Sequence, residues 1–334
     1  MTGTVLALAG GVGGAKLVLG LARVLNDGEL AVVGNTGDDF NHLGLAISPD
    51  LDTLLYTLAG LADQSRGWGR RDETWRFMEA LGQLGGPTWF RLGDADLALH
   101  VERTRRLVAG ETLSAVTNRL RRELGVTTRI LPMTDDPVRT RLRSGPGWLD
   151  FQDYFVRLRC EPMVQELDYV GADAARPLPE VLDILGSDDL RAVVICPSNP
   201  FLSIEPILAI PGMRAAIASC CAPVVAVSPV IAGQAVKGPT TKMMRELGLE
   251  ATAAGVARRY ADLLDAFVVD DADAATVVPD GVDLVAGKTL MTSLEDRERL
   301  ARTVVAAADA AAQRRTSSRR PTEAPGPRGS PGSC

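Results

Sequence analysis

Two turns near the start of the chain combine glycines with polar side chains in a way that suits phosphate chemistry. One spans residues 10–16 and the other residues 35–40, and each follows a short apolar run. Glycines let backbone N–H groups approach a phosphate closely, and the N-terminus of a following helix adds a favourable field. The second turn contains Asp38 and Asp39, whose carboxylates suit a hard divalent cation. Together the turns predict a metal-assisted nucleotide or diphosphate site.

The first turn, Gly-Gly-Val-Gly-Gly at residues 10–14, matches no common nucleotide fingerprint closely. It lacks the Gly-Lys-Ser/Thr end of a Walker loop, and no acidic residue closes a second strand as in the dinucleotide fingerprint. A tight strand–helix turn without a ligand is therefore the alternative. Lys16 is expected in the first helical turn, where the helix dipole prefers acidic side chains, and this conflict favours a phosphate partner.

A third segment, with the sequence SPDLDT at residues 48–53, predicts the start of a helix because serine suits the N-cap and proline the first helical position. Ordinary capping could explain Asp50. On a regular helix Asp50 and Asp52 would project about 200° apart, so both cannot bind one ion from the same face. A shared metal would need one of them to join Asp38 or Asp39. Asp52 could instead accept a hydrogen bond from a substrate hydroxyl.

Several loops offer further contacts to a substrate. Arg91 lies beside a glycine turn and could clamp a phosphate or substrate. Trp68 lies between two glycines and could stack on a planar ring, or it could pack a helical segment onto the sheet. The proline-stiffened loop at 196–203 suits contacts to a base or sugar, or it is a turn that caps a helix. Residues 228–233 with Lys237 repeat this arrangement. The polar side chains of the 196–203 loop are Ser198, Asn199 and Ser203.

The elements that would position these residues alternate along the chain between short apolar runs and helical segments. Strands are expected at residues 5–9, 30–34, 129–132, 192–196, 223–227 and 266–270. Such alternation predicts an α/β fold with a mainly parallel sheet and helices on both faces. In open parallel sheets, ligands bind at the carboxyl ends of the strands, which is where the turns described above would lie.

One block of the chain breaks this alternation. Residues 58–126 contain no convincing strand, and an all-helical insertion beside the sheet is expected there. Helical periodicity in this block covers residues 72–84, 94–109 and 114–124. Residues 141–169 look extended and are expected as an antiparallel edge or a flap.

A last helix is expected at residues 293–313, with Ser293 as its N-cap. The residues beyond it are rich in Arg, Ser, Pro and Gly, and we expect them to be disordered. The expected division of the chain is a catalytic domain of residues 1–57 and 127–313, a helical insertion at 58–126 and a tail at 314–334.

Composition narrows the class of protein. With 334 residues, of which 46% are hydrophobic and 23% charged, the chain can form a sizeable core. The net charge of −6 argues against sequence-independent nucleic-acid binding, because that activity needs a basic face. Basic residues do gather at 103–106 and 119–122, and these clusters are expected as solvated helix surface.

Cysteine, histidine and hydropathy patterns exclude further classes. The five cysteines show no paired or metal-ligand spacing, which argues against a zinc site and predicts a reduced, cytoplasmic protein. No charge-free apolar stretch reaches about 18 residues, so no membrane span is expected. By their spacing, His42 and His100 form no triad with a serine or cysteine, and no nucleophile elbow occurs. Covalent catalysis is therefore not supported.

Taken together, these motifs resemble the 2-phospho-L-lactate transferase family, which acts in the biosynthesis of the deazaflavin coenzyme F-420. The resemblance depends on the whole set of stretches, because no single one is specific. The matching stretches are residues 10–16, 35–39, 47–56, 66–74, 92–96, 130–137, 151–153, 169–172, 197–200, Ser203, 228–233 and 289–293.

The resemblance implies an enzyme that uses a guanosine diphosphate donor whose outer phosphate is esterified to a three-carbon acid. The acceptor is a riboflavin-like chromophore called Fo. Its terminal ribityl hydroxyl attacks the outer phosphorus, which forms a phosphodiester and releases GMP. The acid could be phospholactate, phosphoenolpyruvate or 3-phosphoglycerate. The family also implies Mg²⁺ as cofactor, a Rossmann-like core with a helical insertion, and a homodimer.

The resemblance assigns two residues to the acceptor, and the motifs described above supply hypotheses for the other roles. Asp52 and Arg91 fall at positions that bind Fo, and Trp68 and Phe40 are expected beside them. Phe40 is included because many relatives carry a tryptophan after the position of Asp39. The expected catalytic residues are Asp52, Asp50 and Lys16. The expected donor-binding residues are Gly10, Gly11, Gly13, Gly14, Lys16, Asn35, Thr36, Ser198, Asn199 and Ser203. The expected ligands of Mg²⁺ are Asp50, Asp38 and Asp39.

Two other functions remain open. A relative with the same fold could bind a nucleotide-sugar or a dinucleotide and regulate metabolism without catalysing transfer. Such a protein should lack the Pro-Asp-Leu-Asp-Thr and Arg-Gly-Trp-Gly stretches, and both occur here. A reductase that holds NAD at the glycine turn would need a hydride-transfer site, and the sequence contains no recognisable one. Adding Fo, Mg²⁺ and donor and measuring release of GMP would separate the three functions.

Overall fold

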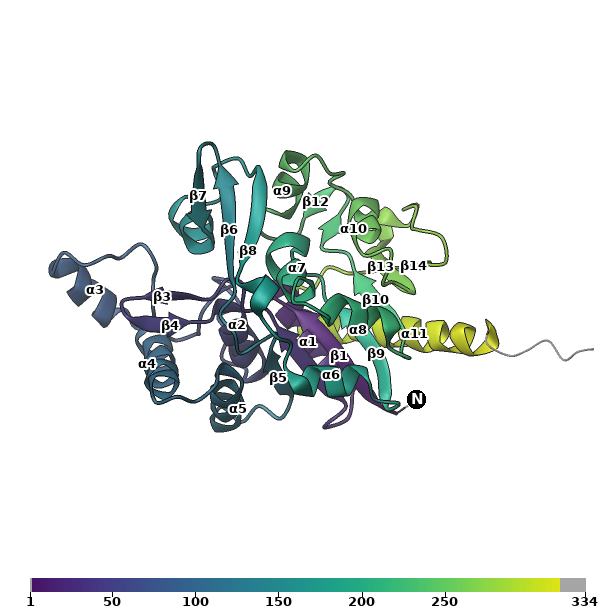
Figure 1. The fold of residues 1–334 in the computed structure, drawn as a ribbon, viewed down its shortest axis with the longest axis horizontal. Coiled ribbons are helices and arrows are strands. Elements are labelled where there is room, and N and C mark those ends of the chain that lie inside the picture. The colour runs from purple at the N-terminus through teal and green to yellow at the C-terminus, as the bar shows by residue number, and fades with distance from the viewer. Residues whose placement is uncertain (1, 319–334) are drawn as a thin grey trace, which may run out of the picture.

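Seven parallel strands form the centre of the structure, a computed structural model that describes residues 2–318 (Figure 1). Their order is β14-β13-β10-β9-β1-β2-β5. Their bounds are β1 (Thr4–Ala9), β2 (Leu30–Gly34), β5 (Arg129–Pro132), β9 (Leu190–Ile195), β10 (Val224–Val227), β13 (Ala266–Asp270) and β14 (Asp283–Gly287). The predicted α/β fold with a parallel sheet is confirmed. Strand β14 was not predicted, because its Asp-Leu-Val-Ala-Gly sequence is only half-buried at the sheet edge.

Helices cover both faces of this sheet. On β1, Val5 and Ala7 face one core cluster while Leu6 and Leu8 face the other, as expected from the two-residue period of a strand. The first face is covered by α1 (Gly11–Val24), α2 (Pro49–Leu58), α5 (Leu113–Glu123) and α11 (Leu294–Ser318). The second face is covered by α6 (Pro179–Leu185), α7 (Glu205–Leu208), α8 (Met213–Ser219), α9 (Thr240–Glu246) and α10 (Ala253–Arg259).

Helices also fill the block between α2 and β5. It contains α3 (Arg76–Gln83), α4 (Asp94–Val108) and α5, whose bounds lie within a few residues of the predicted ones. Within the described part of the chain, the strand pairing recorded in this block is one isolated bridge between Ala62 and Arg70. Helix α3 extends to the left of Figure 1, together with the hairpin of β3 (Phe40–His42) and β4 (Leu45–Ile47).

The segment expected as an antiparallel edge or flap forms a small sheet of its own. Its strands are β6 (Arg139–Ser144), β7 (Gly147–Asp150) and β8 (Glu166–Val170), in the order β7-β6-β8. The short helix η1 (Asp153–Arg157) follows β7. The remaining short elements are β11 (Val230–Ile231), β12 (Gln234–Ala235), η2 (Ala172–Ala174), η3 (Pro200–Ile204) and η4 (Asp271–Asp273).

The last helix, α11, begins as the sequence predicts and ends later. Ser293 acts as its N-cap, since the Ser293 hydroxyl accepts a hydrogen bond from the Asp296 N–H at 3.1 Å. The helix continues to Ser318, so residues 314–318, which were expected in a disordered tail, are helical. Arg315 explains the extension because its guanidinium binds the Asp265 carboxylate at 2.6 and 2.7 Å. The rest of the predicted tail lies outside the described residues.

No single helix of the described residues is both long and apolar enough to cross a bilayer. A pair bent by 83°, made of residues Pro200–Leu208 and Met213–Ser219, passes the test by length and composition only. Both parts belong to the covered second face of the sheet.

Candidate active site

The order in which the parallel strands are added to the sheet changes direction between β1 and β9, and a cavity opens at that point. Strand β1 pairs with β2 on one side and with β9 on the other, so the loops after β1 and β9 diverge there. Ligands bind at such a switch point in open α/β sheets. The cavity has a volume of about 570 Å³, within the range of small-molecule sites. The described structure therefore has a cavity at the edge of the sheet where the sequence predicted the candidate site.

The glycine turn lets three segments approach one another at this cavity. The Gly10 N–H donates to the Ser198 hydroxyl at 3.2 Å, and that hydroxyl donates to the Gly10 carbonyl at 2.8 Å. A Cβ atom on Gly10 would lie 2.5 Å from an oxygen of Asp50, and one on Gly13 would lie 2.5 Å from the Pro197 carbonyl oxygen. Glycine is therefore required here by close approach of the α1 N-terminus to α2 and to the loop after β9.

Asp50 caps helix α1 from the neighbouring helix. Its Oδ1 accepts a hydrogen bond from the Gly11 N–H at 2.6 Å, and its Oδ2 accepts one from Asn35 Nδ2 at 2.9 Å. The Asn35 amide also lies 3.3 Å from Oδ1 of Asp38. Burial raises the pKa of Asp50 to about 6, although these hydrogen bonds oppose the shift. Burial, followed by the charge of Asp50, raises the pKa of Asp38 well above its ordinary value.

Asp38 and Asp50 are the carboxylates that could hold a cation. Both line the cavity, and burial raises the pKa of each, so a cation bound beside them would favour their ionised forms. Asp39, predicted as a third ligand, instead accepts a hydrogen bond from the Ser48 hydroxyl at 2.7 Å and does not line the cavity. Among the residues that the structure describes, no three acidic, histidine or cysteine side chains could hold a metal ion by themselves. A Mg²⁺ ion is compatible with two carboxylates if substrate and water supply its other oxygen ligands.

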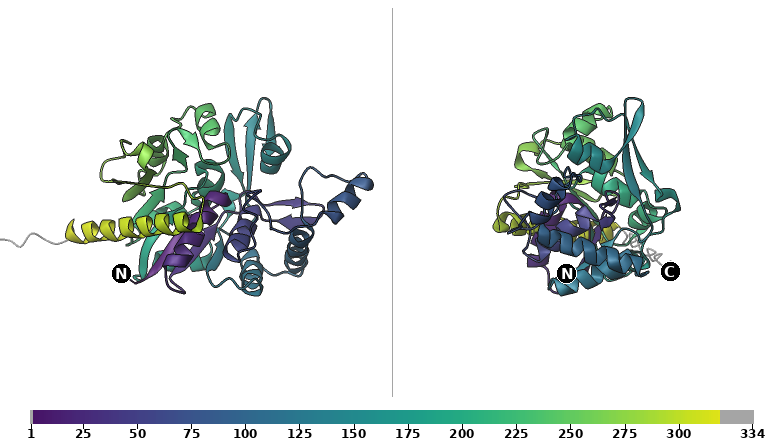
Figure 2. Two further views of the ribbon diagram at one scale, coloured as in Figure 1. Left: turned by 180° about the vertical axis from the view of Figure 1, so that it is seen from behind. Right: turned by 90° about the vertical axis from the view of Figure 1, so that its left-hand side faces the viewer.

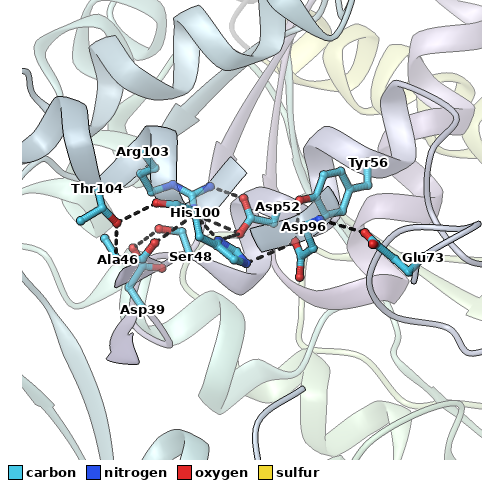
Figure 3. A network of polar contacts seen from close by, with 10 residues as sticks. All are labelled: Asp39, Ala46, Ser48, Asp52, Tyr56, Glu73, Asp96, His100, Arg103 and Thr104. Atoms are coloured by element: carbon cyan, nitrogen blue, oxygen red, sulfur yellow. Dashed lines mark hydrogen bonds and ion pairs between the residues drawn. The ribbon is translucent and has the colours of Figure 1, made fainter. Parts of the chain in front are cut away.

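Asp52 forms a buried ion pair with Arg103 of helix α4 (Figure 3). Arg103 Nη1 lies 3.1 Å from Asp52 Oδ2, and Arg103 Nη2 binds Asp52 Oδ1. Burial opposes the charge on Arg103, but the nearby Asp52 carboxylate outweighs it and raises the arginine pKa. Asp52 lines the cavity, whereas Arg103 lies behind it. Asp52 therefore shares no hydrogen-bond partner with Asp38 or Asp50. This agrees with the predicted offset of about 200° between Asp50 and Asp52 around the helix.

The ion pair belongs to a larger polar network. Arg103 Nη1 is 3.2 Å from His100 Nδ1, and His100 Nε2 is 3.2 Å from Oδ1 of Asp96. Because an arginine can only donate, Nδ1 must accept, so the proton of a neutral His100 lies on Nε2 and faces Asp96. The Tyr56 hydroxyl donates to the same Asp96 oxygen at 2.6 Å. Helices α2 and α4 are therefore joined by polar contacts along one wall of the cavity.

The prediction that Arg103 belongs to solvated helix surface is wrong. Its side chain is 1% exposed, because it fills the space between α4, α2 and β4. A signal was available in the sequence, since Asp96, His100 and Arg103 are spaced by four and three residues and so share one helical face. When a helix has polar side chains on both faces, a regularly spaced set of them on one face indicates a buried polar network.

Two lysines line the cavity near the glycine turn. Lys16 lies in the second turn of α1, not in the first as expected, and its Nζ donates to the Met291 carbonyl at 3.0 Å. Lys237 donates to the Gly67 carbonyl at 2.5 Å. Burial, followed by the charge of Arg297, lowers the pKa of Lys16, while burial and then the charge of Lys16 lower that of Lys237. Neither lysine forms an ion pair within residues 2–318, so together they attract an anion.

Aromatic side chains line another part of the cavity. Phe151 and Phe155 stack with ring centroids 5.2 Å apart, and Arg157 lies 4.5 Å from the ring of Trp89, which connects η1 to the segment before α4. Phe90 also lines the cavity. None of these four rings was predicted as part of the site, because the roughly 60 residues between the two segments leave no periodic signal in the sequence.

The aromatic residues that were predicted have different positions. Phe40 packs edge-on against Phe90, with centroids 4.8 Å apart, and does not line the cavity. Trp68 does line the cavity and is 44% exposed, in contact with Trp75. Arg91 lines it too, and its guanidinium lies 4.2 Å from the ring of Trp75.

The predicted donor residues divide into a lining set and a supporting set. The lining set is Gly10, Gly11, Gly13, Lys16, Ser198, Asn199 and Ser203. The supporting set, which lies behind the wall, is Gly14, Asn35 and Thr36. Asn35 is fully buried and holds Asp50 and the Leu202 carbonyl, so its role is to connect two loops. Asn199 Oδ1 accepts the N–H groups of Phe201 and Leu202, which makes Asn199 the cap of η3.

Similarity to known proteins agrees with this geometry. The model of a family described as 2-phospho-L-lactate transferase CofD matches residues 5–307. A protein named phosphoenolpyruvate transferase from Kitasatospora aureofaciens is 44% identical over 315 residues, which are 91% of this chain and 98% of that protein. A protein of the same name from Thermobifida fusca is 43% identical over 321 residues, or 92% and 97% of the two chains.

Solved structures support the fold. A crystal structure of a member of the UPF0052 family from Bacillus halodurans has a TM-score of 0.59 and covers 91% of this chain and 99% of its own. Its sequence identity is 14%, so the likeness concerns the fold alone. Because the family model matches nearly the whole chain and both relatives exceed 40% identity, the chain is a transferase that belongs to the 2-phospho-L-lactate transferase CofD family.

Proposed function

We propose that the protein transfers a phospho-three-carbon-acid group from its guanosine diphosphate conjugate to the terminal ribityl hydroxyl of Fo, with release of GMP, in F-420 biosynthesis. The observation that carries the proposal is that one cavity joins two chemically different walls. The lining includes the glycine turn, two lysines and two carboxylates, here called the polar wall, and several aromatic rings, here called the aromatic wall. A diphosphate and a flat chromophore need these two kinds of surface within reach of each other.

The polar wall suits the donor. Residues 10–13 line the cavity at the N-terminus of a 14-residue helix, whose dipole favours negative charge. Lys16 and Lys237 add positive charge with no carboxylate partner in the described chain. The loop with Ser198, Asn199 and Ser203 forms the adjacent part of the wall, where it would contact the guanosine end.

Asp38 and Asp50 would hold Mg²⁺. Their unfavourable mutual repulsion is the kind that a bound cation relieves. When bound, the ion would neutralise charge on the diphosphate, which phosphoryl transfer requires. The residues of the chain supply the remaining needs, since the transfer depends mainly on alignment of the attacking hydroxyl with the outer phosphorus and on charge neutralisation.

The aromatic wall suits the acceptor. Trp89, Phe90, Phe151 and Phe155 present ring surface on which a deazaflavin could stack, and Trp68 and Arg91 line the same cavity. Asp52, with both oxygens held by Arg103, retains lone pairs that can accept a hydrogen bond from the ribityl hydroxyl. Asp52 would thereby orient the hydroxyl for attack.

Phosphoenolpyruvate is the acid that we propose, because the two relatives described above carry the name phosphoenolpyruvate transferase. Phospholactate and 3-phosphoglycerate differ from it by small groups, and such differences are worth only about 1–3 kcal/mol in a pocket.

The test is a reaction of purified protein with Fo, Mg²⁺ and equimolar guanosine diphosphate conjugates of the three acids. Mass spectrometry should detect the phosphoenolpyruvate ester of Fo as the main product, with one GMP per ester. Release of GMP without an Fo ester would exclude transfer to Fo. Binding of the donor without turnover would instead favour a regulator of the same fold.

A further inference from the structure

The helical block beside the sheet holds the Asp52 carboxylate through Arg103, whose side chain is buried from solvent. Both terminal nitrogens of the guanidinium bind the two carboxylate oxygens. Such a paired contact fixes the plane of a carboxylate as well as its position. Asp52 nevertheless lines the cavity, while Arg103 does not. The arginine can therefore influence a substrate only through the lining side chains that it contacts, Asp52 and His100.

Arg103 is held from several directions (Figure 3). Its Nη1 lies 3.4 Å from the Ala46 carbonyl on β4 and 3.2 Å from His100 Nδ1 on its own helix. His100 is fixed in turn by Asp96, which accepts from Tyr56 on α2. The backbone N–H of Asp96 donates to Glu73 Oε1 at 2.9 Å, which connects the network to the loop before α3.

We propose that Arg103 is a positioning residue for the acceptor: it orients the Asp52 carboxylate so that its free lone pairs face the ribityl hydroxyl of Fo. The inference rests on the proposed function, because that function makes Asp52 the group that receives the hydroxyl. A carboxylate has about four acceptor sites, and the arginine occupies two of them on the side away from the cavity. The remaining acceptor sites of the Asp52 carboxylate then face the cavity.

The geometry of the guanidinium explains why an arginine stands here. Arginine presents a rigid planar fork, whereas lysine presents a single point charge on a flexible stem. Replacement of Arg103 by lysine would keep the positive charge beside Asp52 but release the carboxylate plane. The acceptor hydroxyl would lose its alignment, and misplacement by about 1 Å is enough to slow transfer by roughly 100-fold.

The experiment compares Arg103→Lys with Arg105→Lys, a matched change on the same helix. Arg105 is 60% exposed and pairs with Glu102, so its replacement should leave transfer unchanged. Steady-state kinetics with varied Fo and calorimetric titration with GDP provide separate measures of the acceptor and donor sites. We expect Arg103→Lys to lower kcat/KM for Fo by about 10- to 100-fold, with the Kd for GDP unchanged.

A double-mutant cycle shows whether Arg103 acts through Asp52. If it does, adding Arg103→Lys to Asp52→Asn should not lower kcat/KM for Fo further. Independent, multiplying effects would overturn the inference, and so would equal kcat/KM values for the Arg103 and Arg105 variants. If Arg103→Lys fails to fold, as judged by circular dichroism and GDP binding, the neutral pair Asp52→Asn/Arg103→Gln takes its place. That pair should transfer no more slowly than Asp52→Asn alone, and slower transfer would overturn the inference.

The outcomes for the two proposals are distinguishable. A wild-type protein that neither binds Fo in a fluorescence titration nor forms the ester overturns the proposed function, and the inference with it. An active wild-type protein whose Arg103 variant behaves like its Arg105 variant overturns the inference alone.

Discussion

Asp38 and Asp50 are buried carboxyl groups at the cavity wall, and ionising both of them costs free energy unless a positive charge lies nearby. Asn35 bridges the two carboxylates with one amide, at 2.9 Å from Asp50 and 3.3 Å from Asp38, but an amide carries no net charge. Burial of an uncompensated charge raises a carboxyl pKa, as both residues show. A bound cation would therefore favour ionisation of both side chains.

Replacement of Asp50 by asparagine should weaken Mg²⁺ binding. Asp50→Asn removes one of two carboxylates at the proposed ion while keeping a side-chain oxygen for the Gly11 N–H. We expect the Mg²⁺ concentration for half-maximal transfer to rise at least about 10-fold. Asp39→Asn is the comparison, because Asp39 is equally buried but binds Ser48 outside the cavity. Equal shifts in the two variants would contradict the assignment of Asp38 and Asp50.

At the scale of single residues, sequence reasoning identified side chains whose chemistry is visible from their type. Asp38, Asp50, Asp52 and Lys16 were selected in this way, and all four line the cavity. The hydrogen-bond and ion-pair partners of these side chains were harder to predict from the sequence, because they depend on tertiary contacts. Arg103 was assigned to helix surface because the carboxylate that it binds lies 51 residues away in the sequence.

At the scale of elements, helices α2 and α4 depend on a polar contact at Asp96. Burial alone would raise the pKa of Asp96, but hydrogen bonds from His100 and Tyr56 outweigh burial and lower it below 3.8. A lowered folded-state pKa means that ionised Asp96 stabilises the fold above its unfolded pKa. This contribution is lost as the pH falls through the lower, folded-state pKa.

Asp96→Asn should therefore be less stable than wild type by about 1–3 kcal/mol at neutral pH, since it loses charged hydrogen bonds. The difference should be constant between pH 7 and pH 5 and should shrink below about pH 4. Urea unfolding at pH 7, 5 and 3 measures it. Tyr56→Phe, which removes one of the two donors to Asp96, should show a smaller loss. A difference that grows as the pH falls would contradict this account.

The α1 N-terminus and the loop after β9 meet too closely for a side chain at Gly13. The Cβ of Gly13→Ala would lie 2.5 Å from a backbone oxygen of Pro197, so one segment must move. We expect a loss of about 1–3 kcal/mol in the free energy of unfolding and weaker binding of GDP, measured by urea unfolding and calorimetry. The control is Gly82→Ala in α3, whose Cβ would meet only a methyl group at 3.4 Å. Unchanged GDP binding in Gly13→Ala would argue against a donor role for the turn.

Elements with strong local signals were predictable from the sequence. The buried strands β2, β5 and β13 have the predicted bounds, because β-branched and aliphatic runs between turns leave few alternatives. Strand β14 was missed since its residues are half-exposed and it begins with aspartate and ends with glycine. The β7-β6-β8 sheet was recognised as extended, but its pairing could not be predicted because register depends on distant partners.

At the scale of the whole molecule, the cavity combines contributions from opposite parts of the chain. The helical block and the β3–β4 hairpin extend to one end of the structure, and α11 extends to the other (Figure 2). Lys237, in the loop before α9, reaches the Gly67 carbonyl 170 residues away, so the two loops meet over the cavity. The division of the chain into a catalytic domain and a helical insertion remains a prediction. The insertion contributes Trp68, Trp89, Phe90 and Arg91 to the cavity lining.

Because the two walls come from different parts of the molecule, changes in one should leave binding at the other intact. Lys237→Met removes a positive charge from the polar wall and should weaken GDP binding about 10-fold, with Fo binding unchanged. Phe155→Ala removes a stacking ring from the other wall and should weaken Fo binding by a similar factor, with GDP binding unchanged. Calorimetry with GDP and quenching of tryptophan fluorescence by Fo measure the two affinities in each variant. If both variants weakened the same ligand, donor and acceptor could not occupy separate walls, and in-line attack across the cavity would have no structural basis.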